Sequence, residues 1–393
     1  MRKQPMAIFM LVMLSVPISA STARAALPGS ASPLVSAFTR HGWVYALRED
    51  GSTVRLTAGT NAYYPALSPD RSRIAYFTVN RSSTAPGSRG IFLNGIWTVG
   101  TQANPQTLVS RLSGTGPSAL AWSPDSRLLA YTLGGVVTIW SVRGRVSTDV
   151  ARPGKRYVSP PAVAWSPGSH RIAFPLASLP DKGPPRTLTI GIAGISGQPF
   201  RTIRVTFPAR LMTASRQAAS SHPDSGQIAW TADGSHLLVA TDFNGEGYGI
   251  TGIWSVADKG GVANLIVGNP AGRPFMDPPV TNATHFLVSP SWKYLATDPE
   301  PHFWVAGVDG EQGRLLAMRQ PVGCRISQYG WLADSRGLAY VSVCPVLGSA
   351  NLRFSLYILR LLDGHRLLAT SAAGPRLDEI SLGPDWRCVE CGF

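Results

Sequence analysis

A short pattern recurs seven times along the 393-residue chain, and it constrains the fold more than any other feature. Each copy joins two apolar runs through a turn rich in Ser, Pro, Asp and Gly. The turn residues are spaced 43 to 65 residues apart, which leaves room for about four short strands in each copy. The copies are PALSPDRSRIAY from Pro65, LAWSPDSRLLAY from Leu120, VAWSPGSHRIAF from Val163, IAWTADGSHLLVA from Ile228, FLVSPSWKYLA from Phe286, YGWLADSRGLAY from Tyr329 and ISLGPDWRCVEC from Ile380.

The residues before each turn alternate between large and small, which is the period of a β-strand. Trp122, for example, follows Ala121, and Trp230 follows Ala229. Each copy is therefore interpreted as a β-hairpin. A column of small residues suits sheets that converge on a common axis, where space runs out. We interpret the tryptophans as core residues rather than as a platform for a ligand.

A second hairpin follows most copies, and the two ends of the chain complete each other. The segment from residue 42 to 57 is a second hairpin with no first one before it, whereas the copy at 378–391 has no second hairpin after it. Pairing these two segments would make one composite sheet and leave no exposed end. The sequence thus predicts an all-β, seven-bladed propeller closed by its N-terminal and C-terminal strands. Six blades are the alternative if the copy at Val288 or Leu382 is degenerate.

These Trp-Ser-Pro-Asp turns, with the Ile-Ala-Tyr or Leu-Ala-Tyr strands after them, resemble the TolB-like β-propeller repeat. The resemblance covers about residues 42–391, and departs from the repeat at Gly168, Ser291, Thr231-Ala232, Leu332-Ala333 and Gly383. It implies a secreted propeller that binds proteins or peptides, often within an envelope complex.

The first 25 residues have the order of a secretory signal: Arg2 and Lys3, an apolar stretch from Ala7 to Val16, and small residues up to Ala25. We expect residues 1–25 to be removed, 26–41 to form a short lead, and 42–393 to form one propeller domain. The processed chain would carry 33 basic and 22 acidic side chains. We expect it in the periplasm, in the cell envelope or outside the cell. An exported basic protein meets anionic envelope material before nucleic acid, so no nucleic-acid partner is expected.

The long connections of the predicted blades all lie on one face. They are 79–90, 152–160, 176–186, 206–225, 242–249, 270–284 and 344–353, whereas the Ser-Pro-Asp and Asp-Gly turns lie on the other face. Binding residues concentrate on such loops. Most of their charges are basic, with an acidic group on two neighbouring units, which suits a peptide with both signs of charge. The expected binding residues are Arg152, Lys155, Arg156, Arg210, Arg216, Asp242, Glu246, Arg273, Asp298 and Glu300.

No catalytic motif is present: G-x-S-x-G, H-E-x-x-H and the phosphate-binding G-x-x-x-x-G-K-[ST] are all missing. His285 and His302 could approach one another on one unit, which keeps a metal-dependent propeller lyase or hydrolase as the alternative function. Residues 242–247 resemble the start of a calcium loop, but its twelfth position is Ile253 rather than Glu. We therefore expect no catalytic residue, metal or cofactor.

The four cysteines fall into two pairs. Cys324 and Cys344 flank a first hairpin almost symmetrically if Trp331 faces Leu338, which predicts a cross-strand disulfide. Cys388 and Cys391 would lie about 10 Å apart in a strand, so they bridge only if the chain curls there. The leading interpretation is an exported, monomeric, non-catalytic module that binds a protein or peptide partner; attachment to the anionic envelope by charge alone is the other binding mode.

Overall fold

The chain divides into two units, Met1–Ser32 and Pro33–Phe393, and the description below concerns the second. The expected signal segment, residues 1–25, lies outside the described residues. The computed structural model describes residues 32–59, 61–79, 92–102, 105–115, 119–133, 135–152, 162–176, 187–196, 199–208, 224–242, 251–268, 287–289, 291, 293–297, 303–307, 314–316, 323–346, 348–349, 351–374 and 380–382.

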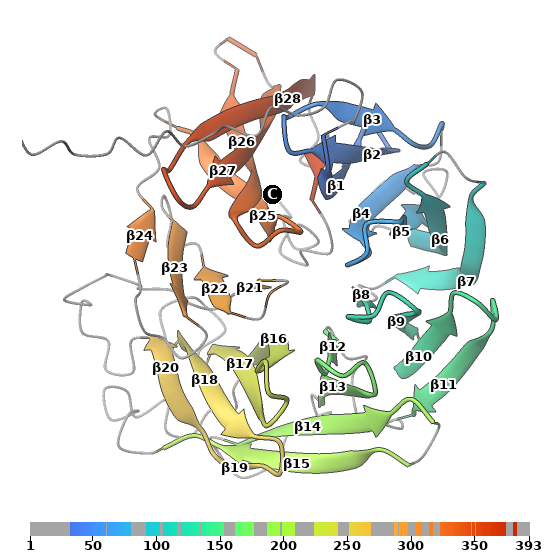
Figure 1. Ribbon diagram of the computed structural model, residues 1–393, viewed down its shortest axis with the longest axis vertical. Helices are drawn as coiled ribbons and strands as arrows, with labels where there is room; N and C mark the ends of the chain where they lie inside the picture. Colours follow the sequence, from blue (N-terminus) through green and yellow to red (C-terminus); the bar gives the residue numbers. More distant parts are fainter. Residues whose placement is uncertain are drawn as a thin grey trace, which may run out of the picture. The chain divides into compact units, whose positions relative to one another are not determined.

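Throughout these described residues the fold is all-β, and its strands form seven separate sheets (Figure 1). We number the sheets in chain order. The composite sheet holds β29 (Ile380–Ser381), β1 (Leu34–Arg40), β2 (Trp43–Arg48) and β3 (Thr53–Arg55). The second sheet holds β4 (Ala62–Leu67), β5 (Arg73–Val79), β6 (Phe92–Gly100) and β7 (Thr107–Thr115). The third sheet holds β8 (Leu120–Trp122), β9 (Leu128–Leu133), β10 (Val136–Ser141) and β11 (Ser147–Ala151).

The remaining four sheets follow the same chain order. The fourth holds β12 (Ala164–Trp165), β13 (Arg171–Leu176), β14 (Thr187–Gly194) and β15 (Arg201–Thr206). The fifth holds β16 (Asp224–Trp230), β17 (His236–Asp242), β18 (Thr251–Ala257) and β20 (Asn264–Gly268). The sixth holds β21 (Leu287–Val288), β22 (Tyr294–Thr297), β23 (Phe303–Gly307) and β24 (Arg314–Leu316). The seventh holds β25 (Arg325–Trp331), β26 (Gly337–Pro345), β27 (Leu352–Arg360) and β28 (Arg366–Gly374).

The Ser-x-Asp turns are stabilised by their own side chains, which form hydrogen bonds with backbone groups that have no backbone partner in the turn. Ser68 Oγ donates to Asp70 Oδ1 at 2.6 Å, and Ser123 Oγ donates to Asp125 Oδ1 at the same distance. The turns also bind their neighbours, since Ser126 Oγ accepts from the amide of Asp70 at 2.9 Å. These contacts place the turn ends of successive sheets side by side. We call them together the turn face, and the opposite ends of the sheets the loop face.

The composite sheet differs from the sequence prediction. We expected residues 42–57 to pair with residues 378–391, but β1 lies between β2 and β29 and pairs with both. Residues 34–40, which we expected in the N-terminal lead, form β1. This strand takes the place expected for the returning strand of the last hairpin. It was missed because no Ser-Pro-Asp turn precedes it.

Seven apolar clusters hold the sheets together, and each cluster spans two sheets. Tyr63 packs with Trp122 between the second and third sheets, and Ile190 packs in the cluster that contains Trp254 between the fourth and fifth. The same arrangement links every sheet to the next along the chain. A further cluster joins the last sheet to the first, where Val35 and Phe38 lie among residues of the seventh sheet such as Phe354. Burial of this apolar surface is the main stabilising contribution.

Four of the repeated tryptophans also make the same hydrogen bond between sheets. Each donates its indole Nε1–H to a carbonyl in the first strand of the preceding sheet. The bonds run from Trp122 to Ala66 at 2.9 Å, from Trp165 to Ala121 at 2.9 Å, from Trp230 to Ala164 at 3.1 Å and from Trp331 to Leu287 at 2.9 Å. Three of the four acceptors belong to the small-residue column.

One connection does more than reverse the chain. The turn between β18 and β20 contains β19 (Gly261–Val262), which pairs in parallel with β15 and adds a fifth strand to the fourth sheet (Figure 1). Beside it, the Arg171 guanidinium donates to Asp258 at 2.8 Å and to the Gly234 carbonyl at 3.0 Å. It also lies 4.6 Å from the centre of the Trp230 ring. The fourth and fifth sheets are thus joined by contacts that the repeat did not predict.

Candidate functional site

Most of the expected loop-face site lies outside the described residues. This applies to Lys155, Arg156, Arg210, Arg216, Glu246, Arg273, Asp298 and Glu300. Asp242 ends β17, with its backbone described. The expected long connection 344–353 is shorter than predicted, because β26 runs to Pro345 and β27 begins at Leu352. Long apolar strands on both sides leave only a tight turn there, closed by a bond from the Val346 amide to the Asn351 carbonyl.

Arg152 is the one expected binding residue whose side chain the structure places. It follows β11 at the loop face and forms an ion pair with Asp149, three residues earlier. Asp149 also accepts a hydrogen bond from Thr138 Oγ1 at 2.9 Å. Both partners are exposed, so water screens the pair and it adds little to stability. Arg152 is therefore accessible at the edge of the expected site.

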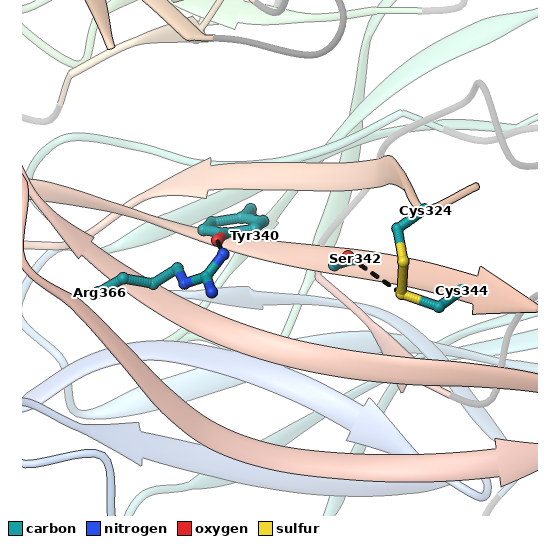
Figure 2. Close-up of a disulfide and its surroundings, with 5 residues drawn as sticks. All are labelled: Cys324, Tyr340, Ser342, Cys344 and Arg366. Atoms are coloured by element: carbon teal, nitrogen blue, oxygen red, sulfur yellow. Dashed lines mark hydrogen bonds between the residues drawn. A yellow bond between two sulfur atoms is a disulfide. The ribbon is translucent and has the colours of Figure 1, made fainter. Parts of the chain in front are cut away.

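The disulfide between Cys324 and Cys344 is present, and it closes the loop-face end of the seventh sheet (Figure 2). Their Cα atoms lie 4.2 Å apart. Trp331 faces Leu338, as predicted, and a bulge between Ile326 and Gln328 then shifts the register by one residue. That shift continues to Arg325 opposite Val343, so Cys324 comes to face Cys344. The bulge is what aligns the two sulfur atoms.

Tyr340, in the same sheet, is a buried core residue and not a reactive group (Figure 2). Burial raises its pKa to about 12, so the phenol stays protonated at neutral pH. Its ring stacks on Tyr357 with 5.3 Å between the centroids. Arg366 reaches the hydroxyl at 3.5 Å and lies over the Tyr357 ring.

Three contacts between the seventh and composite sheets were missed by the sequence analysis. The buried Gln328 accepts the amide hydrogen of Leu382 at 2.6 Å, next to β29. Arg40 donates to Thr370 at 2.9 Å, and Arg360 pairs with Glu49 at 2.7 Å. The last two contacts could not be predicted from the sequence, because their partners lie more than 300 residues apart and belong to no repeated motif.

No group of three or more His, Cys, Asp or Glu side chains in the described ranges is arranged to hold a metal ion. His285, His302 and the calcium-like residues after Asp242 lie outside those ranges, as do Cys388 and Cys391. Among the described residues, no helix has the length and apolar character to cross a membrane.

Comparison with solved structures shows the class of fold. The chain is similar to oligogalacturonate lyase from Vibrio parahaemolyticus, with a TM-score of 0.56 and 10% identity over 86% of both chains. It is also similar to the β-propeller domain of Cps50 (Swd1) from Myceliophteria thermophila, with a TM-score of 0.51 and 13% identity over 81% of this chain and 89% of that one. The chain therefore has a fold of the β-propeller class.

The similar structures also include a TolB-like protein, and no comparison confirms the TolB-like repeat family itself. A TolB structure from Agrobacterium tumefaciens is matched with a TM-score of only 0.41 and 14% identity, over 68% of this chain and 84% of that one. No protein-family model and no curated protein matches the sequence. The comparisons thus define a fold and leave the function to be argued from the residues.

Proposed function

We propose that the chain is an exported, closed, seven-bladed propeller that acts as a non-catalytic module and binds a protein or peptide through its loop face. Closure is supported by β29 beside β1 and by the apolar cluster that joins the seventh sheet to the composite sheet. Export is supported by the N-terminal signal pattern and by the Cys324–Cys344 disulfide, since disulfides persist in oxidising compartments. We propose that the module is a monomer in the periplasm, in the cell envelope or outside the cell.

The contrast between the two ends of the sheets carries this proposal. At the turn face, the described turns are short, and Ser and Asp side chains bond them to one another. At the loop face, the connections that join β1 to β2, β9 to β10 and β26 to β27 are short. The other connections are longer, differ from copy to copy and contain charges of both signs. A rigid scaffold with variable charged loops on one side is typical of a binding module.

The test compares two charge-reversed variants of the immobilised protein in envelope extract. One carries Arg152, Lys155 and Arg156 changed to Glu; the matched control carries the exposed Arg204, Lys259 and Arg336, which lie outside the expected site, changed to Glu. We expect saturable capture of a partner to be lost in the first variant and kept in the second. Equal capture by both variants would contradict a loop-face site.

The enzyme alternative is tested separately, because the fold is shared with a lyase. Elemental analysis of the purified protein is expected to find no stoichiometric metal. One metal per chain, lost on changing His285 and His302 to Ala, would favour a metal-dependent propeller enzyme instead.

A further inference from the structure

Three turns of the second and third sheets form one continuous surface on the turn face, away from the proposed loop-face site. They are 69–73, 124–127 and 142–146, and we call them together the arginine patch. The Asp70 amide bonds to Ser126 Oγ at 2.9 Å, which joins the first turn to the second. The Val142 amide bonds to the Arg127 carbonyl at 3.0 Å, which joins the second to the third.

The arginine patch is strongly basic for its size. It contains Arg71, Arg73, Arg127, Arg143 and Arg145 against two acids, Asp70 and Asp125. Hydrogen bonds within the turns hold both acids: Asp70 accepts from Ser68 and Ser72, and Asp125 accepts from Ser123 and the Arg127 amide. Both carboxylates therefore form their hydrogen bonds within their own turns.

Two arginines elsewhere on the turn face are bound to carboxylates. Arg171 pairs with Asp258, and Arg360 pairs with Glu49 and lies 3.7 Å from Asp334. In the part of the chain that the structure describes, none of the five patch arginines has a carboxylate within ion-pair distance. Their guanidinium groups are therefore available to an external anion.

Two of these arginines occupy backbone positions that other copies give to small residues. Arg71 has a φ of 63°, and the matching residues of four other turns are Ser126, Ser169, Gly234 and Ser335. Arg145 has a φ of 52° and bonds to the carbonyl four residues earlier, as Gly364 does in the seventh sheet. A left-handed conformation disfavours a long side chain. The fold does not require arginine at either place, so we look to binding for its role.

An apolar side chain projects beside these cations. Val146 follows Arg145 and is 60% exposed. A guanidinium group binds phosphate oxygens through two hydrogen bonds, and an exposed aliphatic side chain beside such groups gains further energy where the anions border an apolar phase. A soluble polyanion offers no such phase. We propose that the arginine patch docks the protein onto an anionic phospholipid surface, which leaves the loop face directed away from the membrane.

Co-sedimentation with vesicles tests this docking. The processed chain, residues 26–393, and its variants are used, so that the apolar signal segment does not contribute, and binding is compared between vesicles of phosphatidylcholine alone and vesicles with added phosphatidylglycerol. We expect preference for the anionic vesicles that decreases with salt. The double variant Arg71→Gly, Arg145→Gly should bind about 25-fold less, at about fivefold per arginine. Its melting temperature should be unchanged or higher, because Gly suits both conformations.

The matched control removes two exposed arginines outside the patch, Arg204→Gln and Arg353→Gln, and should bind nearly as wild type does. Val146→Asn, which removes the aliphatic side chain without adding charge, should weaken vesicle binding and leave binding of inorganic polyphosphate almost unchanged. Three results would overturn the proposal: no preference for anionic vesicles at low salt, equal losses in the patch and control variants, or vesicle binding that Val146→Asn does not alter. The last would define a site for soluble polyanions instead.

Discussion

Neighbouring sheets contact one another in two different ways. We compare the tryptophan junctions, which are the four places where a repeated Trp bonds to the preceding sheet, with the seam, which is where the seventh sheet meets the composite sheet. At four junctions, a repeated Trp fills the space between sheets and donates to a carbonyl of the preceding sheet. At the seam, Leu382 stands in the Trp position, and Gln328, Arg40 and Arg360 supply the polar contacts from three different strands. A repeat can therefore lose its characteristic residue where other side chains take over the contacts.

Deleting residues 378–393 should have the largest effect, because it removes β29 and leaves the edge of β1 and the seam cluster exposed. We expect aggregation or loss of the cooperative unfolding transition, measured by size-exclusion chromatography and thermal melting. A control deletion of residues 389–393 keeps β29 and should remain soluble. If the longer deletion is equally soluble and stable, the seam is not needed for folding.

Removing the disulfide with Cys324→Ser and Cys344→Ser should lower the free energy of unfolding by about 3 kcal/mol. The bond closes a segment with a sequence separation of 20 residues in the sheet that holds the seam. Chemical denaturation measures this change, and a reducing agent should destabilise the wild type but not the variant. Free thiols at both positions in exported protein would contradict the bridge.

Removing one hydrogen bond at the seam and one at a tryptophan junction should show that both stabilise the fold. Gln328→Met leaves the buried Leu382 amide without its acceptor, and Trp230→Phe leaves the Ala164 carbonyl without its donor. We expect each to lower the free energy of unfolding by about 1–3 kcal/mol. Denaturant titration of both variants and of the double variant should give additive losses. A loss only for Trp230→Phe would mean that Gln328 is dispensable at the seam.

The smallest effect should be a loss of stability in acid. Burial tends to raise the pKa of Asp70, but hydrogen bonds from Ser68, Ser72 and Ser126 outweigh it and lower the pKa. Hydrogen bonds from Ser235 and Thr231 likewise lower the pKa of Asp233. A lowered folded-state pKa stabilises the protein above the unfolded value of about 3.9, and this contribution is lost as pH falls through the folded value. Asp70→Asn should make the melting temperature depend less on pH below pH 4. The same dependence on pH as in the wild type would argue against this role.

Regular spacing made most of the fold predictable from the sequence. Six of the seven turn motifs mark hairpins in the described residues, and the alternation of large and small residues indicated their strands and the tryptophans of the core. The disulfide followed from symmetry about one turn, although the bulge after Ile326 that aligns it could not be foreseen. β1, the Arg171 contacts and β19 were missed because each depends on packing between distant segments rather than on a repeated motif. The expected loop-face residues, apart from Arg152, stay predictions.

The pairing of β29 with β1 fixes one step in the order in which this molecule can fold. Its ladder with β1 joins residues 39–40 to residues 380–381, so the composite sheet gains this strand only after the residues between them have emerged. Until then the growing chain has an unfinished sheet at its leading end. Until residues 380–381 arrive, the open edge of β1 can pair with any other strand, which would compete with β29 for that place.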